Sequence, residues 1–134
     1  MVSLFGGERI DKNKKLKEEV KKINKDVKEL LKELKDPTAV LWNPKKFKKV
    51  KNLTEKILNE IKKIYKITKN LHDPNLTKIK HLEDHITHLY LILMGYHNMQ
   101  FRGAGSLMEE GAAIKDIDKT AREIHGLLNT INKL

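Results

Sequence analysis

The sequence predicts an all-α protein, an antiparallel up-down-up-down four-helix bundle formed by residues 1–134 as one domain. Three observations predict this fold class. Apolar residues recur at alternating spacings of three and four, which places them on one helical face. Turns containing proline or glycine divide the chain into four segments of about 27 residues each. No strand-like alternation competes with them, and short turns between helices of similar length are typical of such bundles.

The first helix is expected over about residues 9–35, followed by a loop. Its apolar residues form a heptad seam with Lys and Glu at most other positions. We expect the helix to stop at Asp36, because a residue that precedes proline is disfavoured in helical geometry. The segment TAVLWN, residues 38–43, is then a loop that carries the only tryptophan, Trp42. The inward residues are Leu16, Val20, Ile23, Val27, Leu30 and Leu34.

The second and third helices are both expected to begin at a cap followed by proline. Asn43 before Pro44 predicts a helix over about 44–72, and Asp73 before Pro74 predicts another over about 74–101. The inward residues of the second helix are Phe47, Val50, Ile57, Ile61, Ile64 and Leu71. Those of the third are Leu82, Ile86, Leu89, Leu93 and Tyr96.

The fourth helix is expected over about 107–133, after the turn RGAGS at 102–106. Ser106 and Glu109 form a capping box. An antiparallel turn near Ala104 places residue i level with residue 208 − i. Gly95 then faces Ala113, which predicts a close backbone approach, with a small apolar pocket or a partner groove as the alternative. The inward residues are Ile114, Ile117, Ala121, Ile124, Leu128 and Ile131.

Positive charge is concentrated in the first part of the chain. Residues 1–80 carry 22 lysines and Arg9 against 11 acidic residues, whereas residues 81–134 have a net charge of −2. Such a basic region favours a polyanion as partner, either nucleic acid or an anionic membrane surface. A solvated lysine-rich surface that serves only solubility is the competing interpretation.

The strongest candidate site is the segment PKKFKKVKN, residues 44–52. Its lysines oppose the dipole at the start of a helix, and the two acids of that helix are too few to neutralise them. The bundle topology brings the 36–43 loop and the 102–106 turn to the same end. Trp42 is expected to cover the core there, with stacking on a ligand as the alternative. The candidate polyanion-binding residues are Lys45, Lys46, Lys48, Lys49, Lys51, Arg102 and Trp42.

A stripe of histidines borders the apolar face of the third helix. His81, His85 and His88 share one side, and the register brings His125 level with Glu83, so these four histidines are the candidate metal ligands. The inward seams contain no carboxylate, however, and no Glu-x-x-His or His-Glu-x-x-His motif is present. A half-buried, hydrogen-bonded flank is therefore the favoured interpretation, and we expect no metal and no cofactor.

No catalytic arrangement is indicated. The chain has no cysteine, Ser106 is used as a cap, and the glycines at 103 and 105 follow no strand and precede no Lys-Ser or Lys-Thr pair. We therefore expect a non-enzymatic protein that binds a polyanion, nucleic acid above all, with peripheral contact to an anionic membrane as another form of such binding. The alternative is a structural or adaptor protein that binds a protein partner or self-associates through its third and fourth helices. The absence of a long apolar segment predicts a soluble chain without a transmembrane segment, and we expect it in the cytoplasm.

Overall fold

A computed structural model describes residues 3–68, 75–101 and 107–131, and the side chains of 14–68, 76–96 and 111–128. The described residues contain five helices and no strand, which confirms the all-α class but not the predicted number of helices. The helices are α1 (Ser3–Glu33), α2 (Pro37–Trp42), α3 (Pro44–Ile67), α4 (Asn75–Phe101) and α5 (Leu107–Ile131).

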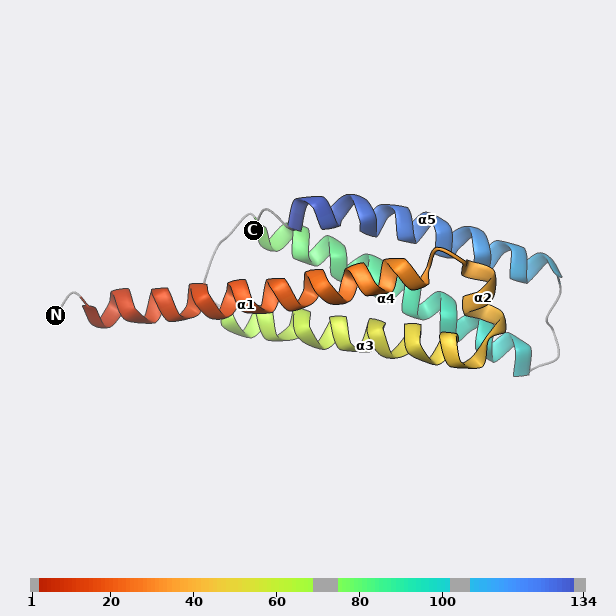
Figure 1. Cartoon of the computed structure of the whole chain (residues 1–134), viewed down its shortest axis with the longest axis horizontal. Coiled ribbons are helices and arrows are strands. Elements are labelled where there is room, and N and C mark those ends of the chain that lie inside the picture. The colour runs from red at the N-terminus through yellow and green to blue at the C-terminus, as the bar shows by residue number, and fades with distance from the viewer. Residues whose placement is uncertain (1–2, 69–74, 102–106, 132–134) are drawn as a thin grey trace.

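The four long helices lie side by side, and successive long helices run in alternating directions (Figure 1). Helix α1 packs against α3 and α5, and α4 packs against the same two helices. The short helix α2 lies across the end at which α3 begins, and it contacts α3 and α5. None of the described helices combines the length and the apolar character needed to cross a membrane.

The core contains the seams that the sequence predicts. Every predicted inward residue whose side chain is described is buried or half-buried, and Leu71 and Ile131 lie outside the described side chains. The buried hydrophobic side chains of all five helices form one cluster. Burying an aliphatic side chain of this size contributes about 1.5–3 kcal/mol, so the seams account for the packing of the helices.

The predicted loop at residues 38–43 is wrong, because residues 38–42 belong to α2 and only Asn43 lies between α2 and α3. Helix α1 begins at Ser3 and ends at Glu33, whereas the sequence predicted residues 9–35. Asp36 caps the next helix: its Oδ1 accepts a hydrogen bond from the backbone N–H of Ala39 at 3.2 Å. Pro37 then stands in the first turn, where its missing N–H costs nothing. Val40 and Leu41 from α2 are buried, so this helix covers one end of the core.

The start of α3 follows the prediction, whereas its end comes earlier. Asn43 Oδ1 accepts from the backbone N–H groups of Lys45 at 3.0 Å and Lys46 at 3.4 Å. The helix ends at Ile67 rather than near residue 72, and the Thr68 hydroxyl donates to the Ile64 carbonyl at 2.8 Å. Helix α5 begins at Leu107 as predicted, but the proposed caps at 73–74 and 106 lie outside the described residues.

The predicted register of the last two helices agrees with a contact between them. His85 Nδ1 lies 2.8 Å from Glu123 Oε2, and these two positions satisfy the relation between i and 208 − i. The expected close backbone approach at Gly95 is wrong, because Gly95 is exposed and a methyl group built on it would meet nothing within 4 Å. Gly111 also has open space.

Candidate polyanion interface

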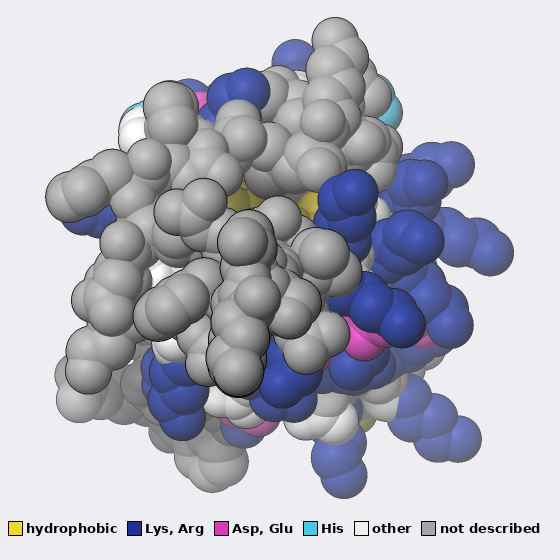
Figure 2. Space-filling view, turned by 90° about the vertical axis from the view of Figure 1, so that its left-hand side faces the viewer, with side chains coloured by type: hydrophobic (Ala, Val, Ile, Leu, Met, Phe, Trp, Pro, Cys, Tyr) yellow, Lys and Arg dark blue, Asp and Glu magenta, His cyan; other side chains and the backbone are white. Residues whose placement is uncertain are grey.

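Helix α3 carries most of the net positive charge of the chain. It contains nine lysines and only Glu55 and Glu60 as acids, whereas α4 and α5 together carry five basic and seven acidic residues. Figure 2, a view toward the end at which α1 begins, shows Lys and Arg side chains most densely on its right-hand side, with acidic side chains among them, and further Lys and Arg side chains at the other edges. The charge asymmetry of the sequence is therefore an asymmetry between helices.

Part of this charge is compensated across the seam between α1 and α3. Lys49 Nζ lies 3.1 Å from Glu33 Oε1 and 3.6 Å from Glu29 Oε1. Lys46 Nζ lies 3.9 Å from Glu33 Oε2. The hydrogen bond and the negative charge of Glu33 raise the pKa of Lys49. Lys46 and Lys49, two of the five predicted lysines, are thus paired with acids of α1. The sequence analysis compared the lysines only with the acids of their own helix.

The other three lysines of the predicted cluster are available to a ligand. Lys45 and Lys48 are exposed and Lys51 is half-buried, and none of them has an ion-pair partner among the described residues. They occupy the first two turns of α3, where the backbone N–H groups add partial positive charge. These three residues are therefore the uncompensated cations in the described part of the cluster.

The expectation that Trp42 covers the core is wrong. Its side chain is 66% exposed, and the neighbouring Val40 and Leu41 are buried in its place. Figure 1 places α2, the start of α3, the end of α4 and the start of α5 at the same end of the molecule. Trp42 and Lys45 therefore share this end, whereas Arg102 lies outside the described residues.

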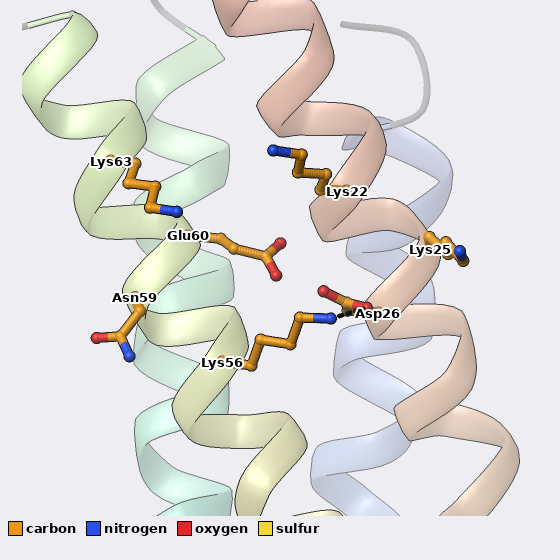
Figure 3. Close-up of a pocket in the computed structure, with 7 residues that line it drawn as sticks. All are labelled: Lys22, Lys25, Asp26, Lys56, Asn59, Glu60 and Lys63. Atoms are coloured by element: carbon orange, nitrogen blue, oxygen red, sulfur yellow. Dashed lines mark hydrogen bonds and ion pairs between the residues drawn. The ribbon is translucent and has the colours of Figure 1, made fainter.

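Two adjoining grooves run along the contact between α1 and α3. The first is lined by Lys45, Lys48 and Lys49 together with Glu29. The second, of about 490 Å³, is lined by four lysines and by Asp26 and Glu60 (Figure 3). Because Lys56 lines both grooves, the lysines border one continuous path along the two helices.

Two carboxyl groups lie buried at the bottom of the second groove, contrary to the expectation that the seams contain none. Asp26 of α1 is 4% exposed and Glu60 of α3 is 5% exposed. Their side chains point toward each other across the gap between the helices (Figure 3). Lys56 Nζ lies 3.4 Å from Asp26 Oδ1, whereas Glu60 Oε2 has no hydrogen-bond partner among the described residues.

This environment favours the neutral form of Glu60. Burial, followed by the hydrogen bond and charge of Asp26, raises the pKa of Glu60 from 4.5 to about 8, and the charge of Lys56 acts in the opposite direction. Glu19 adds a smaller effect that also raises it. The sequence contains an indication of this pair. Asp26 directly precedes the inward residue Val27 and Glu60 directly precedes the inward residue Ile61, so both acids border an apolar face.

The four histidines are not brought together. His81, His88 and His125 are exposed, and half-buried His85 contacts Glu123 on α5. In the part of the chain that the structure describes, no group of three or more His, Asp or Glu side chains is arranged to hold a metal ion. The contact of His85 is the kind of interaction expected of a flanking histidine.

Comparisons of this chain with protein-family models, with curated proteins and with solved structures find no match.

Proposed function

We propose that the protein is a non-enzymatic binding protein for nucleic acid. In this proposal the four long helices form an antiparallel up-down-up-down bundle, and α3 presents its lysines to the phosphate backbone. The observation that carries the proposal is that exposed Lys45 and Lys48, without ion-pair partners among the described residues, line a groove. Contacts of this kind neutralise phosphates and release counterions, which gives affinity without sequence preference.

The exposure of Trp42 supports the same proposal. An exposed indole beside a lysine cluster can stack on an unpaired base, and removing such a contact costs about 1–3 kcal/mol. Replacing Trp42 by Ala should therefore weaken the binding of a single strand more than that of a duplex. A loss of thermal stability without a change in binding would assign Trp42 a structural role.

The main test is the salt dependence of binding, measured by fluorescence anisotropy with a labelled duplex. Replacing Lys45, Lys48 and Lys51 together by Gln should flatten the slope of log affinity against log salt by about two to three units. The matched control replaces three exposed lysines on α4 and α5, Lys80, Lys115 and Lys119. Both variants lose the same charge, and the control should change the slope by less than about one unit.

Two outcomes would contradict the proposal. Absence of binding at about 50 mM salt, where even non-specific contacts are strong, would exclude nucleic acid as the partner. Equal changes of slope in the two triple variants would mean that only net charge matters. Vesicles that contain an anionic lipid are tested in parallel. Tighter binding to the vesicles than to nucleic acid would mean that the lysines of α3 bind a membrane surface.

A structural or adaptor role is the second candidate, and one observation favours it. Leu91 on α4 is 61% exposed within an apolar stretch of that helix. An exposed apolar side chain of this size can contribute to a contact with a protein partner or with a second copy of the chain. Under this alternative the lysines serve solubility only.

A further inference from the structure

The groove that contains Asp26 and Glu60 combines groups of opposite tendency. Lys22, Lys56 and Lys63 line it with their ammonium groups, which attract an anion. The two carboxyl groups at its bottom repel an anion when both are ionised. The charge that a ligand meets in this groove therefore depends on whether the carboxyl pair holds a proton.

The placement of Glu60 makes it the group that holds this proton. Its carboxyl group is buried, points at Asp26, and has one oxygen without a hydrogen-bond partner among the described residues (Figure 3). Asp26 has the ammonium of Lys56 beside it at 3.4 Å, whereas Glu60 has no ion-pair partner among the described residues. Two close carboxyl groups rarely ionise together, so the one without the cation takes up the proton.

We infer that polyanion binding in this groove is coupled to the uptake of one proton from the solvent by the Asp26–Glu60 pair. This inference rests on the proposed function and names a regulation of the same surface. When a phosphate approaches, its negative charge opposes the ionisation of Glu60. When Lys56 turns from Asp26 toward the phosphate, the pair loses a cation that favours ionisation. Both effects act in the same direction.

Charged groups on each side of Glu60 support this direction. Asp26 and Glu19 of α1 raise its pKa and Lys56 of its own helix lowers it, while burial makes the largest contribution. The acids of α4, Glu83 and Asp84, act instead on Tyr65, whose pKa is raised mainly by burial. Because the pKa of Glu60 is about 8 without ligand and higher with it, Glu60 already holds its proton at pH 7, and the affinity should fall mainly as the pH rises above about 8.

The size of the effect follows from the charge of one phosphate. At about 7 Å and an effective dielectric constant of about 20 to 40, this charge raises the pKa of a carboxyl group by about one to two units. Affinity for a polyanion should then be about fivefold to tenfold weaker at pH 9 than at pH 7, at constant ionic strength.

The test is an anisotropy titration with a labelled oligothymidine strand at pH 7 and pH 9. Replacing Glu60 by Gln keeps the shape of the neutral acid. This variant should bind the strand with similar affinity at both pH values, and more tightly than wild type at pH 9. Replacing Glu55 by Gln is the matched control, because Glu55 is an exposed acid on the same helix that does not line this groove. This control should keep the wild-type dependence on pH.

A second measurement follows the proton directly in the wild-type protein. The carboxyl carbon of Glu60, observed by NMR, should titrate near pH 8 and at a higher pH when the strand is bound. Binding that is equal at both pH values, or a Glu60→Gln variant that retains the dependence, would overturn this inference and leave the proposed function standing. Absence of binding at pH 7 and low salt would overturn both.

Discussion

The seam between α1 and α3 and the seam between α4 and α5 belong to one core, yet they differ in the charges that border them. Acids of α1 pair with Lys46, Lys49 and Lys56 of α3, and two carboxyl groups are buried there. At the other seam, the pair of His85 and Glu123 joins helices that together carry a small negative charge. Since α4 and α5 pack in the same core without a lysine excess, the fold itself does not require the lysines of α3.

The two regions also distribute their apolar residues differently. Helix α3 confines them to one face and covers its other sides with lysines. Helix α4 packs against both α3 and α5, and residues 89–96 are apolar on nearly every side of it. A helix that is apolar all round needs cover on more than one side, which its two neighbours provide in part. The uncovered side is where Leu91 lies exposed.

The largest expected effect tests whether the two regions share one core. Ile61 on α3 and Leu89 on α4 are both 0% exposed. Replacing either one by Ala should lower the free energy of unfolding by about 3 kcal/mol, because each change removes buried methyl groups and leaves a cavity. Urea unfolding followed by circular dichroism should give one transition for each variant.

The control for this comparison is Lys62→Ala, a change on the exposed side of α3 next to Ile61. It should alter the free energy of unfolding by less than about 0.5 kcal/mol. A variant that unfolds in two steps, or a large loss for one core substitution only, would mean that the α1–α3 region and the α4–α5 region are stabilised separately.

A smaller effect concerns the dependence of stability on pH, which should arise from the α1–α3 seam. The pKa of Glu60 is about 8 in the folded protein and ordinarily 4.5. The folded state therefore keeps a proton that the unfolded chain releases, and its stabilising effect is lost as the pH rises from about 4.5 to 8. Glu60→Gln lacks this loss. After allowance for solvent screening in the groove, the difference in free energy of unfolding between Glu60→Gln and wild type should therefore increase by about 2 kcal/mol from pH 5 to pH 9.

Chemical unfolding at a series of pH values measures this gain, with Glu55→Gln as the control. The control should run parallel to wild type, because Glu55 is exposed. Parallel curves for wild type and Glu60→Gln would show that the carboxyl pair is not a source of pH dependence. The contact between α1 and α3 would then not differ from the contact between α4 and α5 in its effect on stability.

Most of the fold could be predicted because the apolar spacing is regular. The seams of Val20 to Leu34 and of Leu82 to Tyr96 determine which faces are buried, and the cap at Asn43 determines where α3 begins. Helix α2 was missed because Asp36-Pro37 both ends one helix and begins another. The same two residue types at 73–74 were interpreted as a helix start. The Asp-Pro pattern at 36–37 was therefore sufficient to predict a helix there as well.

The candidate site was less predictable because it depends on contacts between helices. Counting charges within α3 does not reveal that Glu33 of α1 reaches Lys49. The burial of Glu60 depends on which edge of α3 faces α1, and helical periodicity alone does not determine that to within one residue. The exposure of Trp42 follows from the helical turn of α2, which directs Val40 and Leu41 inward in its place.

The smallest expected effect is at Leu91, and it separates the two candidate functions. Because this side chain is 61% exposed, replacing it by Ser should change the free energy of unfolding by less than about 0.5 kcal/mol. If the lysine face of α3 is the functional surface, Leu91→Ser should also leave the affinity for a labelled duplex unchanged, since the two surfaces lie on different helices. The molar mass of both proteins in solution, measured by light scattering, completes the comparison. If the wild-type protein self-associates and the Leu91→Ser variant does not, Leu91 lies in an interface between two copies of the chain. That result would support the structural or adaptor alternative and would place the functional surface on α4 rather than on α3.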